Sequence, residues 1–390
     1  MRHLMSALSI LVLALVLGCG PTSSQPAAPK PHAPGGSDGS DAGAGTPAVP
    51  GCDPADPDAN ADQDGDGYSI AQGDCDDCNP TVNPGAIQVP GDATDYACNG
   101  MPGVVAACDG ALAGLRDAAS LAKALDQCDP RFFLSAMLVG PSDARARKVV
   151  PRFGVLQPRG GQAMALLSNG IAADKSDADF DANVEEDPGT ELSVSNSYAN
   201  PLPALVGAAG CSQSQPATVN DYTELVVKLK APSNANSFSF DFQFFSAEYP
   251  VWVCTEFNDE FLVLQESAAE FATPTNIAFD QQKNPVTVNN GFFAVCTNDP
   301  SKLETQHCTH PVSGISGTGF EDPPLGPGGS IPGGSTGWLT TTSPVSPGES
   351  VTLHFIIFDE GDHVLDSAAL IDNFRWGVSV VQTPVTAPIQ

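Results

Sequence analysis

Basic residues are scarce in this chain. Its 390 residues include 16 lysines and arginines against 46 aspartates and glutamates, which gives a formal net charge of −30 at pH 7. Such a protein is repelled by the phosphates of nucleic acids and by anionic membrane surfaces. The composition therefore argues against nucleic acid as a partner and favours cations.

The apolar run near the N-terminus is short. Ser6–Leu17 has 12 residues, too few to span a bilayer as a mature helix, and it follows an arginine and a histidine as the core of a secretory signal does. The run ends in VLGC, which resembles the bacterial lipobox. This resemblance implies a signal peptide over residues 1–18, cleavage before Cys19 and lipidation of its thiol. Ordinary secretion with cleavage nearby is the alternative.

The segment that follows is rich in proline, glycine and alanine. Gly20–Gly51 has no apolar periodicity and cannot bury a core, so residues 19–51 are predicted to be a lipidated cysteine with a disordered tether. A flexible coil of this length spans roughly 30 Å, and an extended one up to about 100 Å. Acyl chains would anchor it in a membrane. We expect a bacterial cell envelope location, at the outer membrane or cell surface.

Residues 52–103 contain many aspartates and few large apolar residues, so core burial alone cannot fold them. DQDGDGYSIAQGDCDDCNP, Asp62 to Pro80, holds six aspartates within 16 residues. No lysine or arginine occurs between Lys30 and Arg116, an interval with 14 aspartates. Basic side chains nearby cannot neutralise this cluster. We expect disulfides, a metal ion or both to hold the segment.

The spacing of the aspartates is typical of a metal-binding loop. Asp62, Asp64 and Asp66 alternate, and Gly67 and the carbonyl of Tyr68 follow. Oxygens at positions one, three and five, a glycine at six and a carbonyl at seven can wrap a hard cation. Position twelve, where an EF-hand closes with a carboxylate, is a glycine, so this loop closes differently. A disordered acidic linker is the alternative.

Residues 62–86, DQDGDGYSIAQGDCDDCNPTVNPGA, resemble the MopE-type metal-binding motif of bacterial surface proteins, which combines DxDGDGY, DCDD and NPGA with a further cysteine. By position, the resemblance implies these ligands: Asp62, Asp64, Asp66, the Tyr68 carbonyl, Asp74 and Asp76, with Asp77 as a further candidate. We take Cys75–Cys98 and Cys52–Cys78 as candidate disulfides.

The name of this family is associated with copper, but the ligands here are oxygens. Copper prefers nitrogen and sulfur, and the stretch contains no histidine. Zinc at the CxxC of Cys75 and Cys78 would need two further thiol or imidazole ligands, and a redox dithiol would need a thioredoxin-like context. We therefore predict Ca²⁺, with copper and zinc less favoured.

The sequence from residue 104 to 385 is typical of a globular domain. Ala111–Gln127 spaces apolar residues at three and four, which predicts a helix bracketed by a Cys108–Cys128 pair. Alternating apolar residues predict strands at Tyr222–Lys230, Ser237–Phe245, Glu260–Gln265, Val351–Phe358 and Ser367–Trp376. Phe238, Phe240, Phe242 and Phe244 would share one face. We predict a mainly β fold, a jelly-roll-like antiparallel β-sandwich with a short N-terminal helix.

Five motifs of this region recur in the same order in another family. They are ACDGALAGL (107–115), LLSNGIA (166–172), FDFQFFSAEYPVWVCTEFNDEFLVL (240–264), NIAFD (276–280) and FDEGDHVLDSAALIDNFRW (358–376). This part of the chain, about 104–380, resembles choice-of-anchor L domains. The resemblance implies cell-surface localisation rather than a known catalytic activity.

Acidic residues at the ends of the predicted strands suggest a second metal site, because oxygen ligands can converge there. Its candidate ligands are Glu248, Asn258, Asp259, Asp359, Asp362 and Asp366. The alternative is that these acids cap turns and solubilise the surface. The remaining cysteines, for which we also expect disulfides in an exported chain, are Cys211, Cys254, Cys296 and Cys308.

Catalytic motifs of the GxSxG and HExxH types do not occur in the sequence. Glu248 and Glu256 could form a glycosidase pair, and His307, Cys308 and His310 could bind a soft metal, although a Cys296–Cys308 disulfide is favoured. We predict a non-enzymatic surface lipoprotein that is membrane-anchored through its lipid and displays the sandwich to a surface protein or glycan. A polysaccharide-acting, carboxylate-based hydrolase is the alternative.

Overall fold

The computed structural model describes residues 49, 52–53, 58–105, 108–141, 143–180, 198–202, 211, 216–289, 292–298, 308–323, 330–361 and 363–389. These residues belong to one compact unit, Thr46–Gln390. The predicted signal peptide, Cys19 and nearly all of the predicted tether lie outside the described residues.

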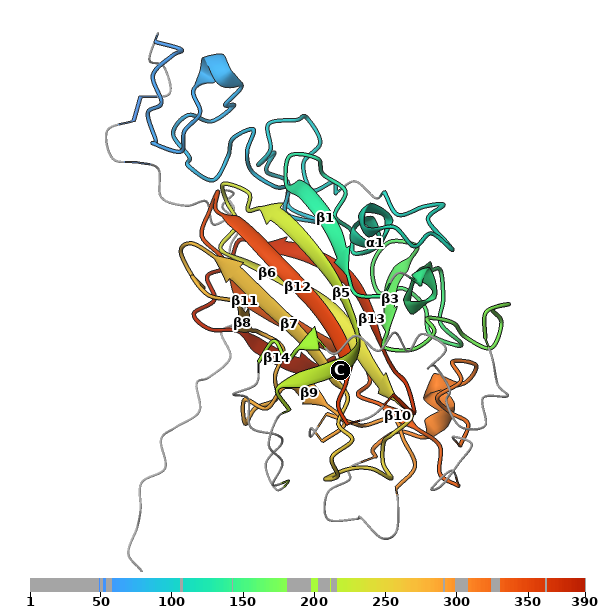
Figure 1. Cartoon of the computed structure of the whole chain (residues 1–390). Helices are drawn as coiled ribbons and strands as arrows, with labels where there is room; N and C mark the ends of the chain where they lie inside the picture. Colours follow the sequence, from blue (N-terminus) through green and yellow to red (C-terminus); the bar gives the residue numbers. More distant parts are fainter. Residues whose placement is uncertain are drawn as a thin grey trace, which may run out of the picture. The chain divides into compact units, whose positions relative to one another are not determined.

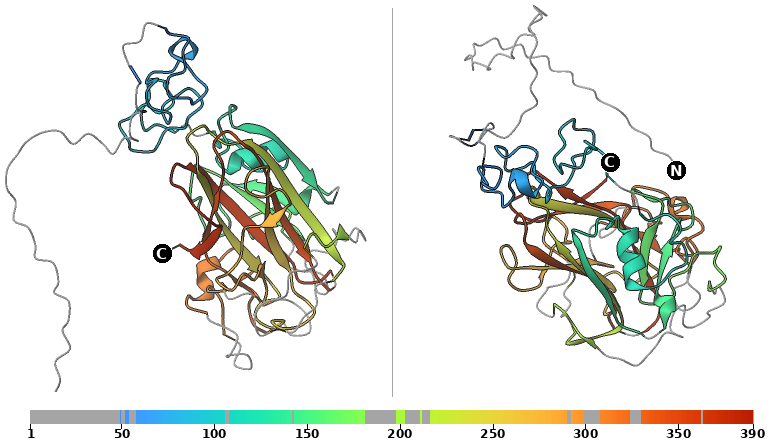
Figure 2. Two further views of the ribbon diagram at one scale, coloured as in Figure 1. Left: turned by 90° about the vertical axis from the view of Figure 1, so that its left-hand side faces the viewer. Right: turned by 90° about the horizontal axis from the view of Figure 1, so that it is seen from above.

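Two antiparallel sheets form the body of this unit (Figures 1 and 2). The first has the order β1 (Phe133–Val139), β5 (Thr218–Lys230), β12 (Ser350–Asp359), β7 (Glu260–Ser267) and β8 (Thr275–Asn276), with β4 (Tyr198–Ala199) beside β5 and β9 (Val286–Thr287) beside β7. The second has the order β14 (Val385–Pro388), β11 (Leu339–Pro344), β6 (Ser237–Ser246), β13 (Ser367–Gly377), β3 (Met164–Ser168) and β2 (Arg147–Val150), with β10 (Gly334–Ser335) beside β6. The predicted antiparallel sandwich is confirmed.

The five strands predicted from alternation all form. β5, β7 and β12 lie in the first sheet, whereas β6 and β13 lie in the second. The chain therefore crosses between the sheets from β5 to β6, from β6 to β7 and from β12 to β13. Consecutive long strands face each other across the core instead of pairing as hairpins.

The phenylalanines of β6 form the centre of the core. Phe238, Phe240, Phe242 and Phe244 are at most 1% exposed and belong to the cluster between the sheets. Phe240 meets Phe355 of β12 edge to face, with ring centroids 5.3 Å apart. Burial of one such side chain contributes about 1.5–3 kcal/mol, so the predicted phenylalanine face accounts for much of the stability of the sandwich.

The predicted helix over 111–127 is too long. The observed α1 spans only Ala118–Ala124, because the Asp117 side chain accepts a hydrogen bond from Ser120 N and starts the helix there. Before it, Gly114 has a φ of +82° and its N–H donates to Val149 O of β2 at 2.8 Å. Residues 111–117 therefore form turns that pair with the edge of the second sheet.

The other helical segments among the described residues are single 3₁₀ turns. They are η1 (Ile70–Gln72), η2 (Ala144–Ala146) and η4 (Val312–Ile315). The first is the one regular element that the structure shows within 58–105, so the Asp-rich segment is fixed by turns and cross-links instead of by a core.

Two disulfides close the Asp-rich segment, Cys52–Cys78 and Cys75–Cys98. The others join Cys108 to Cys128, Cys211 to Cys254 and Cys296 to Cys308. The four pairings proposed from the sequence are all present. The fifth joins the two cysteines for which we proposed no partner.

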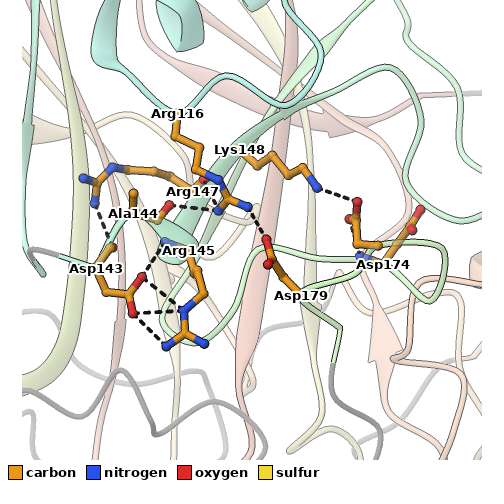
Figure 3. A network of polar contacts seen from close by, with 9 residues as sticks. Arg116, Asp143, Ala144, Arg145, Arg147, Lys148, Asp174 and Asp179 are labelled. Carbon is orange, nitrogen blue, oxygen red and sulfur yellow. Dashed lines mark hydrogen bonds and ion pairs between the residues drawn. The ribbon is translucent and has the colours of Figure 1, made fainter.

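Basic side chains gather in a network around η2 and β2 (Figure 3). Arg145 Nη2 pairs with Asp143 Oδ2 at 2.8 Å, Arg116 pairs with Asp179, and Lys148 pairs with Asp177. In this network the acidic side chains have arginine and lysine partners.

Candidate metal centre

The aspartates of the loop use some of their oxygens to shape the backbone. Asp64 Oδ1 accepts from Asp66 N at 3.2 Å, Asp66 Oδ1 from Tyr68 N at 2.8 Å, and Asp74 Oδ1 from Asp76 N at 2.9 Å. These contacts, each to an amide two residues further on, are Asx turns, which Asp forms readily. They direct the second oxygens of these side chains away from the backbone of the turns.

Asp62 closes the first turn of the loop. Its oxygens accept from Gly65 N at 2.7 Å and from Gly67 N at 3.0 Å. Both glycines have positive φ values, +81° and +95°, which residues with a Cβ rarely adopt. The backbone conformation therefore requires the two glycines of the DxDGDG pattern, while its aspartates supply the oxygens.

Carboxylates from both ends of the loop converge in space. Ligand atoms of Asp62, Asp64 and Asp77 lie within 4.8 Å of one another, and so do those of Asp64, Asp66 and Asp74. Asp64 belongs to both groups. The structure thus joins the DxDxD run to the later DCDD run, and Asp74 and Asp77 supply the closure that the glycine at position twelve cannot.

Three oxygens of this cluster are buried and accept no hydrogen bond within the described part of the chain. They are Oδ2 of Asp64, Asp74 and Asp77. Asp74 and Asp77 are only 4% and 5% exposed. A buried carboxylate oxygen without a partner costs several kcal/mol by order of magnitude, and a hard cation coordinated by oxygens would remove that cost.

Burial also changes the acidity of the cluster. Desolvation, reinforced by the neighbouring carboxylates, raises the pKa values of Asp64 and Asp74 to about 6. Burial also raises the pKa of Asp66. Without a cation these side chains retain protons well above the ordinary aspartate range, and a bound cation would favour their ionised forms.

Asn83 supports the cluster, and our sequence analysis missed it. Its Nδ2 donates to Asp66 Oδ2 at 2.7 Å, while its Oδ1 accepts from Gly85 N at 2.8 Å and from Ser233 Oγ at 2.6 Å. Gly85 is needed because a Cβ there would lie 2.6 Å from the Tyr68 hydroxyl. The NPGA part of the motif, which contains both residues, was the available signal.

Of the predicted ligands, Asp62, Asp64, Asp66, Asp74 and Asp77 are brought together, and Asp76 is exposed and belongs to neither group of three. The half-buried Tyr68 follows the Asp66 turn. The donor set consists of oxygens, because the thiols of the nearby cysteines are in disulfides. These residues fit a hard cation better than copper or zinc.

The second predicted set lies at one end of the sandwich. Asp259 N donates to Glu248 Oε2 at 3.3 Å, and Asn169 Nδ2 donates to Asp259 Oδ2 at 2.7 Å. Asn258 and Asp359 are buried as well, while Asp362 lies outside the described residues. Burial argues against a surface-solubilising role for Glu248, Asn258, Asp259 and Asp359. The contact from Asp259 N to Glu248 Oε2 fits the turn capping that the same alternative includes. Metal binding by this set stays a prediction.

Glu360 joins this buried cluster without having been predicted. Its backbone carbonyl accepts from Asn258 N at 3.4 Å, and its Oε1 accepts from Asn200 Nδ2 at 3.4 Å. Burial, together with the charge of Asp259, raises the pKa of Glu360 to about 8. A proton on Glu360 therefore removes part of the charge of this cluster at neutral pH.

Asp366 also lies close to this end of the sandwich. Its backbone carbonyl accepts from Ala247 N at 3.1 Å, and its carboxylate occupies the space beside Gly170 that a Cβ would need. Gly170 follows Asn169, the residue that donates to Asp259. The SNG part of the LLSNGIA motif thus contacts two of the predicted acidic residues.

The residues considered for catalysis differ in burial and in bonding. Glu248 is buried and Glu256 is exposed. Cys308 is bonded to Cys296, so a soft-metal site that uses its thiolate is excluded. His310 is exposed with Nδ1 2.9 Å from Thr309 Oγ1, and His307 lies outside the described residues.

Residues 211–374 match the choice-of-anchor L domain. The match runs from just before β5 into β13 and includes the buried acidic residues between Glu248 and Glu360. The Asp-rich loop, α1 and β1–β3 lie outside it. This match favours a surface-associated protein, and no curated protein or solved structure matched the chain.

Within the described ranges, none of the helices has the length and apolar character needed to cross a bilayer. The predicted lipid attachment at Cys19 falls outside those ranges and stays a prediction.

Proposed function

We propose that this protein is a surface lipoprotein in which a calcium-clamped Asp-rich module lies between an N-terminal tether and the choice-of-anchor L region. The observation that supports it best is that Asp64 shares one carboxylate group with Asp77 and another with Asp74, with ligand atoms within 4.8 Å in each group, while each of these three side chains keeps a buried Oδ2 that accepts no hydrogen bond in the described structure. The segment from 31 to 115 contains no lysine or arginine that could neutralise these carboxylates.

Calcium suits this donor set because it takes six to eight oxygens in flexible geometry. Asp64, Asp74 and Asp77 would contribute their unpartnered oxygens, and Asp62 and Asp66 lie within reach. Extracellular calcium modules bind at about 10⁻⁴–10⁻³ M, so the ion would act as a folding ligand. At a hundredfold excess over Kd it would stabilise the module by about 2.7 kcal/mol.

The clamp would also fix how the module is joined to the sandwich. Asn83 links Asp66 to Ser233, and Asn234 forms two hydrogen bonds with the backbone of Ile87, at 3.0 and 3.1 Å. Ordering the Asp66 side chain therefore orders a contact with the turn between β5 and β6. We propose that calcium makes the module a stiff base for the sandwich.

The lipid on Cys19 and the tether would hold this base at a bacterial outer membrane or cell surface. The sandwich would then present its loops to a surface protein or a glycan. The match to the choice-of-anchor L domain supports a surface role, and the acidic composition argues against nucleic acid.

Calorimetric unfolding of the mature chain, with calcium and with chelator, tests the proposal. We expect chelator to lower the melting temperature of the wild type, and to lower that of an Asp64→Asn/Asp74→Asn variant by clearly less, because the loop of the variant no longer binds the ion. Asp92→Asn replaces a half-buried aspartate of the same module that belongs to neither carboxylate group, so it is the matched control and should keep the response. Equal melting of the wild type in both conditions would refute the calcium clamp.

A further inference from the structure

A tight turn outside the Asp-rich module is held by carboxylates. Asp372 Oδ2 accepts from Gly160 N at 3.1 Å and also from Arg159 N, and Asp109 Oδ2 accepts from Ala163 N at 2.7 Å and also from Gln162 N. The two aspartates come from distant parts of the chain. The centre of the turn, between the amides that Asp372 binds and those that Asp109 binds, consists of Gly160 and Gly161.

The glycines are required because other oxygens fill the space above them. A Cβ at Gly160 would lie 2.5 Å from Asp126 Oδ2 and 2.9 Å from Asn373 Oδ1. A Cβ at Gly161 would lie 2.7 Å from Asp126 Oδ1 and would collide with Asp109 Oδ2. Asp126 therefore lies over the turn, with Asp109 on one side and Asn373 on the other.

Two separate features hold these side chains in place. The Cys108–Cys128 disulfide, with a Cα–Cα distance of 5.3 Å, joins the segments that carry Asp109 and Asp126. Asn373 lies where the register of β13 against β6 shifts, between Asp372 and Arg375. Such irregularities redirect side chains out of the regular pattern of a sheet.

The oxygens of this cluster have unused coordination capacity. Asp109 is 1% exposed, and its buried Oδ1 accepts no hydrogen bond from any described residue. Asn373 Nδ2 donates to Asp241 Oδ2 at 2.8 Å, so its Oδ1 is turned toward Asp126. Burial, with a further contribution from the Asp109 charge, raises the pKa of Asp126 to about 6.

The nearby basic side chains are directed elsewhere. Arg159 Nε lies 3.5 Å from Asp241 Oδ2, and Arg375 Nη2 lies 3.3 Å from Asp241 Oδ1. Within the described ranges, the Asp126 carboxylate has no ion pair or hydrogen bond. Two adjacent carboxylates and one amide oxygen, with Asp126 half-buried and open to solvent, suit a hard divalent cation.

We propose that Asp109, Asp126 and Asn373 bind a calcium ion, with water completing its coordination. The ion would cross-link the disulfide loop around α1 to β13 of the sandwich. This site is separate from the Asp-rich loop and does not depend on it.

Calcium counting by equilibrium dialysis tests this site. The parent is the mature chain with Asp64→Asn/Asp74→Asn, in which the Asp-rich loop is inactivated. We expect Asp126→Asn to bind one calcium fewer per chain than this parent at saturating calcium, and the same loss in a chain with an intact loop. Asp143→Asn removes an aspartate that is ion-paired with Arg145 and should leave the count unchanged.

Melting temperatures provide a second readout that a structural effect alone would not produce. In chelator, Asp126→Asn relieves repulsion from Asp109 and should raise the melting temperature. In the presence of calcium the Asp126→Asn variant lacks the stabilising ion. Its melting temperature should then exceed that of the parent by less than in chelator, or fall below it. Asp109→Asn keeps an oxygen for the turn amides and should behave in the same way.

An unchanged calcium count for both variants would overturn the proposal. So would an Asp126→Asn melting shift of the same size in chelator and in calcium, because the two aspartates would then only repel each other or share a proton. If the Asp64→Asn/Asp74→Asn substitutions leave the calcium count of the chain unchanged, the proposed clamp in the Asp-rich module is wrong, but the site at Asp109, Asp126 and Asn373 is not affected by that result.

Discussion

The Asp-rich loop and the buried end of the sandwich both gather carboxylates, but they stabilise them in different ways. At the end of the sandwich, Asn169 donates to Asp259, and Glu360 is held protonated around neutral pH. In the loop, Asp74 and Asp77 retain buried oxygens that accept no hydrogen bond within the described ranges. At the end of the sandwich, amide donors and a proton reduce the charge of a cluster whose backbone the hydrophobic core already fixes. Where a segment has almost no core, an ion can neutralise the charge and cross-link the chain together.

The basic network around η2 and β2 shows a third way of stabilising carboxylates. Around Arg116 and Lys148, aspartates are neutralised by side chains of opposite charge (Figure 3). The Asp-rich loop cannot use this solution, because lysine and arginine are absent from residues 31 to 115. In the Asp-rich segment, side chains of opposite charge are therefore not available nearby in the sequence, and the proposed ion would take their place.

The largest effect is expected from the core of the sandwich. Phe242→Ala should lower the free energy of unfolding by about 3–5 kcal/mol, because it leaves a cavity beside Phe261. The loss should be the same with calcium and with chelator, measured by denaturant unfolding. The exposed Val380→Ala is the control and should change stability by less than about 0.5 kcal/mol. A calcium-dependent loss for Phe242→Ala would mean that core and clamp are coupled.

The next largest effect concerns the cross-links of the Asp-rich segment. Replacing Cys75 and Cys98 by serine should cost the module about 2–4 kcal/mol, and it should also weaken calcium binding because Asp74 is adjacent to Cys75. Limited proteolysis between residues 52 and 103, with and without calcium, measures the effect. Cys296→Ser/Cys308→Ser, in the sandwich, should leave cleavage of the module unchanged. If the variant without Cys75–Cys98 keeps full calcium protection, the disulfide is not needed to close the loop.

The third prediction concerns pH. Folded Glu360 holds its proton up to about pH 8, whereas the unfolded chain releases it near 4.5. Between these values the folded state binds more protons, so stability should fall as pH rises, by at most about 1.4 kcal/mol per unit. Glu360→Gln should flatten this slope in unfolding curves between pH 5 and 8. The exposed Glu266→Gln should keep it, and an unchanged slope for Glu360→Gln would assign the effect to other groups.

The smallest effect is expected at Asp76. Asp76→Asn should change stability by less than about 0.5 kcal/mol and should keep the calcium response, because this side chain is exposed and lies outside both carboxylate groups. Calcium titration monitored by calorimetry measures it beside Asp74→Asn. Equal losses for the two variants would make Asp76 a ligand, as the motif implies.

Much of the fold could be predicted from the sequence. Alternation predicted β5, β6, β7, β12 and β13 because a half-buried strand requires apolar residues at every second position. The helix was predicted too long, since apolar spacing alone did not show that Asp117 caps it. The short strands β2 and β3 were missed.

In the candidate sites, too, the sequence predicted features that depend on neighbouring residues and missed those that depend on distant contacts. Spacing marked the aspartates of the loop, since Asx turns and glycine turns are local. Asn83 and Glu360 were missed because their roles depend on contacts with Ser233 and Asn200, which are far away in the sequence. The cluster of Asp109 and Asp126 gave no signal of its own apart from the two glycines of the turn that both carboxylates approach.

Neighbouring residues in the sequence set three features: the lack of lysine and arginine near the loop, the turns that its aspartates form and the apolar pattern of the strands. Contacts between distant segments set which carboxylates lie close together and which are buried, so these features are visible in the folded structure alone. Convergence of Asp64 with Asp74 and Asp77, or of Asp109 with Asp126, depends on disulfides and packing between distant segments. The cost of a buried charge, and so the need for an ion or a proton, arises only when those segments meet.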